Sequence, residues 1–401
     1  MNFYCDIRVA IFSQRQKSND MDTVLENPFL VSGYESPTYF CDRKKEAETL
    51  TEMLRNGRNV TLTSPRRIGK TGLIKHTFHL LKTQSPEITT IYIDLFPTAN
   101  LSDFTQVFAS AVLGQLDSSP VKALRKIMDF FKGLRPSMSI DEVTGKPVLN
   151  LDIARGSESS TIGQVFHYLK QSGKTCFIAF DEFQQIANYP ETNVEALLRS
   201  YMQDLHNVRF IFSGSQSHML QEMFLSPKRP FYLSTAVMTI ETIPEDTYYA
   251  FASSFFQKQD RTLPEDVFRK LYQRYEGYTW YLQMILNRIY AKAQRPIDEA
   301  LFHECIRDIL EENEYYYQHL IRIYPKGQMK LVKAIAKEKK VKEITAGAFI
   351  AKYDLTATSS VKGALKRMLD EEIVYQAPDG GYLVYDRFFG EWLDSRFANP
   401  R

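Results

Sequence analysis

The segment "LTSPRRIGKTGL", residues 62–73, is the most informative part of the sequence about the fold. Its Gly-Lys-Thr at 69–71 ends the phosphate-binding loop pattern G-x-x-x-x-G-K-[ST], but Ser64 stands where that pattern begins with glycine. Residues 60–63 have the alternation of a short buried strand, and residues 73–81 repeat apolar side chains at helical spacing. Strand, loop and helix form the context of a phosphate-binding loop, so we predict one here.

The serine does not argue against phosphate binding. Pro65 fixes its own φ and limits Ser64 to extended backbone, which a small serine adopts unless the position requires a positive φ. Backbone N–H groups at the helix start would surround a phosphate, with Gly69 allowing close approach. Lys70 would reach the β- and γ-phosphates, and the Thr71 hydroxyl would bind Mg²⁺. The residues predicted to bind the nucleotide here are Ser64, Pro65, Arg66, Arg67, Ile68, Gly69, Lys70, Thr71 and Gly72.

Two acids follow a second buried strand. In "CFIAFDEF", residues 176–183, Asp181 and Glu182 stand at the strand's carboxyl end, where open α/β sheets bind ligands. A helix-capping role is the alternative, but the preceding phosphate-binding loop favours Asp181 as a magnesium ligand and Glu182 as the group that activates the attacking water. In "VRFIFSGSQ", Ser213 or Ser215 would face the γ-phosphate, although a Ser-Gly-Ser strand end equally suits a plain turn.

Buried strands alternate with helices up to about residue 240, which predicts a parallel sheet covered on both faces. After that, helical patterns dominate until a hairpin pattern near the C-terminus, the order of a winged helix-turn-helix. The predicted parts are a flexible leader at 1–24, a phosphate-loop α/β domain at 25–240 with a β-hairpin insert at about 137–153, a helical lid at 241–322 and a winged helix-turn-helix domain at 323–401.

Composition is that of an ordinary globular protein. The 401 residues carry a net charge of +2 and are 44% apolar and 24% charged, so any basic surface must be local. The four cysteines are scattered, which suggests neither a zinc site nor a disulfide framework but free thiols in a reducing cytoplasm. No apolar run has the length of a membrane span. We therefore expect a cytoplasmic protein without a membrane partner.

Several motifs together resemble one family. "SPRRIGKTGLI", "FIAFDEFQQI", "FIFSGSQ" and the terminal "VYDRFFGEWL" are similar to the archaeal-type P-loop ATPases, which are related to the AAA+ and STAND ATPases. The resemblance covers about residues 27–393. It implies a three-layer, AAA+-like α/β sheet, a helical lid and a winged helix, with ATP and Mg²⁺ as cofactors. It also implies an ATP-driven conformational switch that the winged helix reports.

The resemblance assigns two further arginines. "YFCDRKKE", residues 39–46, is similar to a family motif whose arginine and adjacent backbone border the adenine pocket, which gives Arg43 that role. "SPKRPFY", residues 226–232, is similar to the segment where an arginine that reads the γ-phosphate lies. Arg229 is the candidate and Lys228 the second choice, while a solvated basic loop fits equally well.

A third segment, "EGYTWYLQ" at residues 276–283, resembles the family's Gly-x-Pro-x-Tyr-Leu-Gln helix start. Thr279 and Trp280 stand around the usual position of proline, which leaves a sensor role open. We interpret Tyr281 and Leu282 as core of the lid.

The predicted third helix of the winged helix, "TSSVKGALKRMLDEE", offers a DNA-binding surface through Lys362, Lys366 and Arg367. The acids at 370–372 weaken that interpretation, and no arginine or asparagine stands at the helix start, where bases are usually read. Protein interaction or autoinhibitory packing is therefore favoured, with DNA binding left open.

The predicted function is ATP binding with Mg-dependent hydrolysis, because a protein that only binds nucleotide has no need for Glu182. The catalytic set is then Glu182, Lys70, Ser213, Ser215 and Arg229, with Mg²⁺ at Thr71 and Asp181. The alternative is a DNA-binding regulator or a protein-interaction scaffold that holds ATP without significant turnover. Oligomeric state is open, with a homo-oligomer among the choices.

Overall fold

The computed structural model describes residues 24–116, 134–140, 147–153, 156–215, 217–292, 295–377 and 379–397. The predicted leader lies outside them except for Val24. Contacts divide the chain into a first unit, up to Phe251 with Tyr278–Gln283, and a second unit, Ala252–Gly277 with the chain from Met284 onward. This division passes through α9 (Glu245–Gln257) and α11 (Thr279–Ala291). The predicted domain boundaries stay predictions, because a division into two units does not separate a lid from a winged helix.

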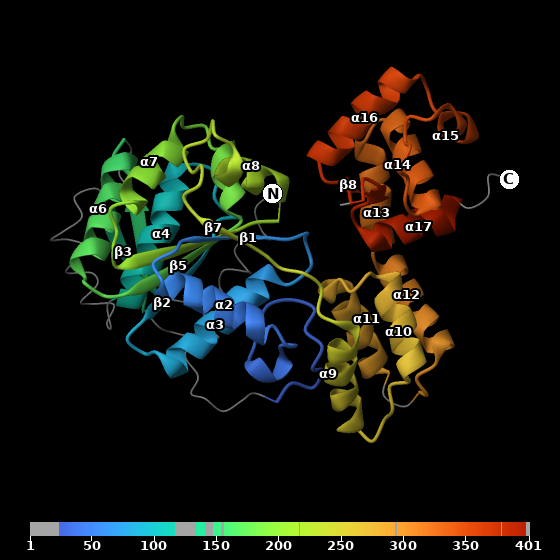
Figure 1. Ribbon diagram of the computed structural model, residues 1–401, viewed down its shortest axis with the longest axis horizontal. Coiled ribbons are helices and arrows are strands. Elements are labelled where there is room, and N and C mark those ends of the chain that lie inside the picture. The colour runs from blue at the N-terminus through green and yellow to red at the C-terminus, as the bar shows by residue number, and fades with distance from the viewer. Residues whose placement is uncertain are drawn as a thin grey trace. The chain divides into compact units, whose positions relative to one another are not determined.

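A five-stranded sheet organises the first unit (Figure 1). Its strand order is β2-β5-β6-β1-β7, and every pairing in it is parallel. The edge strand β7 was not predicted from the sequence, because it is only four residues long and half exposed. The strands are β1 (Val60–Thr63), β2 (Thr89–Asp94), β5 (Cys176–Asp181), β6 (Val208–Ser213) and β7 (Ala236–Thr239).

Both faces of this sheet are buried, as parallel sheets require. On β5, Phe177 and Ala179 pack with the helices of one face, whereas Ile178 and Phe180 pack with those of the other. The first face is covered by α2 (Lys44–Arg55) and α3 (Lys70–Gln84), and the second by α4 (Leu101–Leu116), α6 (Glu158–Gln171), α7 (Val194–Met202) and α8 (Ser217–Leu225). The three layers bring the loops after β1, β5 and β6 to one edge of the sheet.

The inserted strands β3 (Leu134–Ile140) and β4 (Pro147–Ile153) pair antiparallel, with Leu134 opposite Ile153. The part of the predicted β-hairpin insert between these strands, residues 141–146, lies outside the described residues.

The second unit is helical apart from a small hairpin. Tyr317 of α13 is buried against Phe389 and Trp392 of α17, with ring centroids 5.2 and 5.6 Å away, so the helices before the hairpin share a core with the last helix. Val341 adds one bridge to β9. The elements are α10 (Glu265–Arg274), α12 (Glu299–Glu312), α13 (Glu314–Ile323), α14 (Lys326–Glu338), α15 (Gly347–Lys352), α16 (Thr358–Asp370), β8 (Val374–Gln376), β9 (Tyr382–Val384) and α17 (Arg387–Phe397).

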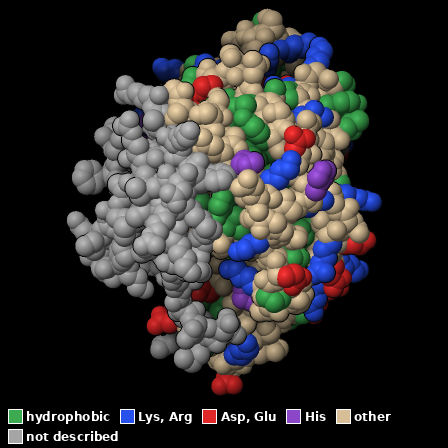
Figure 2. All heavy atoms as spheres, turned by 90° about the vertical axis from the view of Figure 1, so that its left-hand side faces the viewer, with side chains coloured by type: hydrophobic (Ala, Val, Ile, Leu, Met, Phe, Trp, Pro, Cys, Tyr) green, Lys and Arg blue, Asp and Glu red, His purple; other side chains and the backbone are tan. Residues whose placement is uncertain are grey.

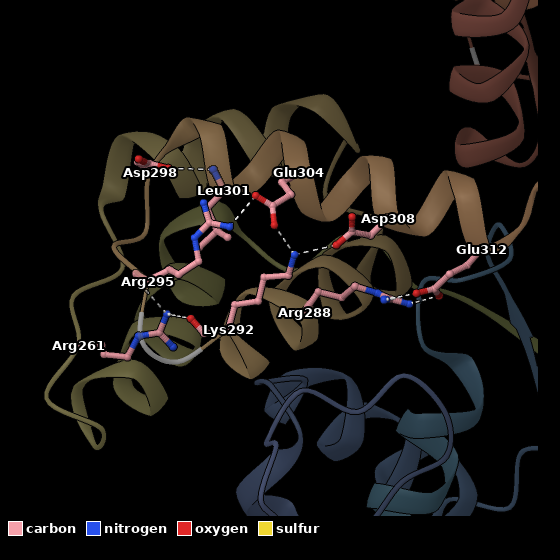
Figure 3. A network of polar contacts seen from close by, with 9 residues as sticks. All are labelled: Arg261, Arg288, Lys292, Arg295, Asp298, Leu301, Glu304, Asp308 and Glu312. Carbon is pink, nitrogen blue, oxygen red and sulfur yellow. Dashed lines mark hydrogen bonds and ion pairs between the residues drawn. The ribbon is translucent and has the colours of Figure 1, made fainter.

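Charged side chains join α11 and the segment after it to α12 (Figure 3). Lys292 lies 2.6 Å from a Glu304 oxygen and 2.7 Å from an Asp308 oxygen, and Arg295 lies 2.6 Å from the other Glu304 oxygen. The two cations lower the pKa of Glu304 to about 2. Arg261 donates to backbone carbonyls at the end of α11, where a cation is favourable. The network therefore fixes the C-terminal part of α11.

Figure 2 shows one face of the molecule, on which basic and acidic side chains are interspersed over the described surface. This mixture agrees with the small net charge.

None of the helices within the described ranges combines the length and the apolar character needed to span a bilayer.

Candidate nucleotide-binding site

The phosphate-binding loop spans the six residues between β1 and α3. Gly69 immediately precedes α3 with φ of 107°, and a Cβ at this position would meet nothing within 4 Å, so the backbone angle rather than lack of space requires glycine. Arg67 also has a positive φ, 69°, whereas Ser64 does not. A serine can therefore replace the glycine that usually begins the loop.

Lys70 fills the interior of this loop. Its ammonium donates to the carbonyl oxygens of Ser64 and Pro65 at 2.9 and 3.2 Å, and it lies 3.3 Å from the Ser64 hydroxyl. The lysine is 8% exposed. A buried cation surrounded by neutral carbonyls is well placed to exchange them for the charged oxygens of a phosphate.

Asp181 joins three elements through its carboxylate. One oxygen accepts from the Thr71 hydroxyl at 2.6 Å and from the Tyr92 hydroxyl at 2.8 Å, and the other accepts from Ser213 at 2.5 Å. The structure thus brings the predicted magnesium residues Thr71 and Asp181 into contact. The Ser213 hydroxyl donates to Asp181, and its predicted role facing the γ-phosphate stays a prediction.

Glu182 follows Asp181 with φ of 55°, in the left-handed region. Its Oε2 accepts from the Ser215 backbone N–H at 3.1 Å, from the Ser215 hydroxyl at 2.7 Å and from Gln184 Nε2 at 2.5 Å. The structure therefore brings together Glu182 and Ser215, which were predicted separately. Gln184, in the short 3₁₀ helix η3 (Phe183–Asn188), was missed.

Tyr92 was also missed, although it donates directly to Asp181. Burial and the nearby acids Asp181 and Asp94 raise the pKa of Tyr92 well above its ordinary value, so its hydroxyl stays a donor. The ammonium of Lys75 lies 4.6 Å from the centre of the Tyr92 ring, and burial lowers the pKa of this lysine. Burial has the opposite effect on the carboxyl of Asp94, whose pKa it raises.

Arg43 contacts the backbone of the phosphate-binding loop. Its guanidinium is 2% exposed and donates to Glu46 at 2.7 Å, to the Ile68 carbonyl at 3.1 Å and to the Glu241 carbonyl at 2.6 Å. Arg43 thus supports the loop backbone at Ile68. Its predicted place beside adenine stays a prediction.

The start of α11 contacts the same loop. The Arg67 guanidinium lies over the rings of Trp280 and Tyr281, 4.3 and 5.0 Å from their centres, and it donates to the Tyr281 hydroxyl. The Trp280 N–H donates to the Arg67 carbonyl at 3.1 Å, and the Thr279 hydroxyl donates to the Ile68 carbonyl at 3.1 Å. Tyr281 is buried, but it lies beside the phosphate-binding loop as well as in a core.

Arg229 contacts acidic residues of α7 and α8. It pairs with Glu195 of α7 at 2.5 Å and approaches Glu222 of α8 at 3.8 Å. Burial raises the pKa of Glu195 and the arginine opposes that rise. Within the described residues, no hydrogen bond or ion pair joins Arg229 to Asp181 or Glu182, so its role at a γ-phosphate stays a prediction.

The predicted DNA-contact residues lie on the exposed side of α16. Lys362 and Lys366 are exposed, one helical turn apart, and Arg367 pairs with Glu371 at 2.7 Å. Near the hairpin, Asp379 lies 2.8 Å from Lys340 and 3.7 Å from Lys342. Acids therefore neutralise part of the basic surface of the winged helix.

Two protein-family models match this chain. The model of an "ATPase domain predominantly from Archaea" matches residues 40–285, and that of a "Probable winged helix domain" matches residues 315–395. Because the first match covers more than half of the chain, the protein belongs to this family of ATPase domains. The predicted resemblance is thereby confirmed.

Solved structures share the fold. A Walker-type ATPase of Pyrococcus abyssi has a TM-score of 0.64 at 16% identity, over 91% of this chain and 99% of the other. The Aeropyrum pernix ORC2 protein, in ADPNP–ADP complexes, has a TM-score of 0.58 at 15% identity, over 93% and 98%. The Aeropyrum pernix ORC1 protein, in complex with DNA, has a TM-score of 0.52 at 14% identity, over 93% and 98%. The predicted fold class is confirmed.

No curated protein matches the chain.

Proposed function

We propose that the protein is a Mg-dependent ATPase whose nucleotide state controls the position of α11. The observation that carries the proposal is the contact between Thr71 and Asp181, at 2.6 Å, with Glu182 as the next residue. A hydroxyl from the helix after the phosphate-binding loop, a carboxylate at a strand end and a second carboxylate beside it form the residue set for Mg-nucleotide hydrolysis.

The phosphates would bind at the N-terminus of α3. Its backbone N–H groups and the helix dipole favour negative charge there, and Gly69 leaves the approach open. Lys70 would exchange the Ser64 and Pro65 carbonyls for phosphate oxygens.

The residues present fit a magnesium ion. Mg²⁺ prefers hard oxygen ligands and binds through few protein groups, which the Thr71 hydroxyl and the Asp181 carboxylate provide. When bound, the ion neutralises charge on the β- and γ-phosphates. Ser213 and Tyr92 would keep the Asp181 carboxylate oriented by donating to it.

Glu182 would activate the attacking water. Oε2 is held by Ser215 and Gln184, which leaves Oε1 for the water proton. The water oxygen bonds to the γ-phosphorus, its proton passes to Glu182, and the bond from the γ-phosphorus to the bridging oxygen breaks with its electron pair going to ADP.

The switch proposal is supported by the contacts between the loop and α11. Arg67 and Ile68 are tied to the first turn of α11 by two hydrogen bonds and by stacking. A change in the loop as Lys70 turns to phosphate would move that turn. The ion network at the other end of α11 would carry the movement into α12 (Figure 3).

For the winged helix, we propose DNA contact through α16 as a second function. The exposed pair Lys362 and Lys366, one turn apart, supports it because both ammonium groups can reach a phosphate backbone together. Their neighbour Arg367 is engaged by Glu371, which weakens this surface.

The proposed activity is tested by measuring ATP binding and phosphate release with Mg²⁺ and with EDTA. We expect wild type to release phosphate only with Mg²⁺, Lys70→Ala to lose turnover by about 100-fold or more, and Glu182→Gln to lose turnover while still binding ATP. Lys82→Ala is the matched control, because Lys82 is an exposed lysine in the last turn of the same helix. Equal turnover in wild type and Lys70→Ala would contradict the proposal.

A further inference from the structure

Gln184 contacts the catalytic acid proposed above. It is 4% exposed, and its side-chain amide lies 2.5 Å from Glu182 Oε2. A carboxylate can only accept hydrogen bonds, so the nitrogen of this amide must face Glu182 and its oxygen must point away. The contact therefore fixes the orientation of both side chains.

Gly214 makes room for that orientation. A Cβ on Gly214 would lie 1.9 Å from Gln184 Oε1 and 2.9 Å from its Cδ. The φ of Gly214 is not in the left-handed region, so its backbone suits other residues, but a Cβ there would have to displace the amide of Gln184 from its present position. The glycine between Ser213 and Ser215 is thus explained by the amide of Gln184 and not by a turn.

The amide oxygen has no compensating contact. Gln184 Oε1 is buried and accepts no hydrogen bond from the part of the chain that the structure describes. Leaving a buried acceptor without a hydrogen-bond donor is destabilising. A methionine would fill the same volume without that cost, which points to a role for the N–H groups at the other end of the amide.

We propose that Gln184 is a positioning residue for hydrolysis, which acts by holding Glu182 Oε2 and so directs Oε1 to the attacking water. The inference rests on the proposed ATPase function. Ser215 donates to the same oxygen from the end of β6, so the carboxylate is held between η3 and β6.

The first test compares Gln184→Met with Gln185→Met. Methionine keeps the length and volume and removes the donor. Gln185 is the matched control, since it lies on the same η3 turn but donates to the Thr98 carbonyl at 3.0 Å. We expect Gln184→Met to lower kcat about 10- to 100-fold with KM and the ATP dissociation constant changed less than about threefold. Gln185→Met should keep the wild-type kcat.

Epistasis separates positioning from simple packing. In a Glu182→Gln background, Gln184→Met should lower the residual rate no further, because Gln184 acts through Glu182. Gly214→Ala should reproduce the kcat loss by displacing the amide, yet it should cost little more in a Gln184→Ala background, where the overlapping atoms are gone. The Gly214 cycle decides the question if Gln184→Met fails to fold.

The outcomes distinguish the two claims. Wild-type kcat in Gln184→Met, or independent losses from Gln184→Met and Glu182→Gln, would overturn the positioning role alone. Absence of Mg-dependent turnover in the wild-type protein, or full turnover in Glu182→Gln, would overturn the ATPase proposal and the role of Gln184 with it.

Discussion

The edge of the parallel sheet and the outer side of α16 both carry charged residues, but in opposite settings. Asp181 is 5% exposed and accepts hydrogen bonds from three side-chain hydroxyls, whereas Lys362 and Lys366 are exposed at the surface. A buried carboxylate with several donors has one stable geometry, while exposed lysines rearrange freely. The first setting suits chemistry on a positioned substrate, and the second suits a partner that supplies its own geometry.

The sharpest contrast comes from removing an acid in each region. Asp181→Ala leaves the hydroxyls of Thr71, Tyr92 and Ser213 without their acceptor, so we expect the free energy of unfolding to fall by about 3 kcal/mol and turnover to be lost. Asp370→Ala, on α16, should change neither. Chemical denaturation and phosphate release measure both effects, and equal effects of the two variants would break the contrast.

A second, smaller effect is expected where the phosphate-binding loop meets α11. The chain has two tryptophans, so Trp392→Phe makes the emission report on Trp280 alone. Because Arg67 stacks on that ring, we expect ATP to change its emission, and Arg67→Met to abolish the change and cost about 0.5–2 kcal/mol of stability. If ATP binds but leaves the emission of Trp280 unchanged, the proposed switch is contradicted.

Tyr92→Phe removes one donor from Asp181 and leaves the others in place. We expect the free energy of unfolding to fall by about 1 kcal/mol, with a smaller loss of turnover than in Asp181→Ala. Thermal unfolding and steady-state turnover test this. An unchanged unfolding free energy would mean that the hydroxyl does not donate to Asp181.

The smallest effect is expected on α16. The double variant Lys362→Ala/Lys366→Ala should keep the wild-type melting temperature and basal turnover. If both lysines contact DNA, the slope of log K against log salt concentration should become shallower by about 1.8, that is about 0.9 for each lost phosphate contact. An unchanged slope would remove α16 as a DNA surface and favour a protein partner.

The pattern of the sequence predicted the loop and the two acids because their positions depend on local order, strand before loop before helix. Tyr92 was not predicted as a site residue because its strand has an apolar pattern. Its contact with Asp181 depends on β2 lying beside β5. Gln184 was not predicted for a similar reason, since its position depends on a 3₁₀ turn and on the space at Gly214, which follows β6. Register between distant segments sets these contacts.

Other features follow the same rule. Strand β7 is short and lies at the sheet edge, so its alternation is too weak to read. Arg67 binding to the nucleotide stays a prediction, whereas its stacking partners, which come from a helix more than two hundred residues later, were not predicted. Sequence pattern predicts which chemistry is present, and tertiary packing decides which side chains hold it in place.

Single-turnover phosphate release measures whether Glu182 activates the water that hydrolyses ATP. Wild type and Glu182→Gln are each mixed in excess over ATP with Mg²⁺, after equal ATP affinity has been established by equilibrium binding. We expect Glu182→Gln to release phosphate about 100- to 10,000-fold more slowly than wild type. Equal rates of release in the two proteins would contradict it.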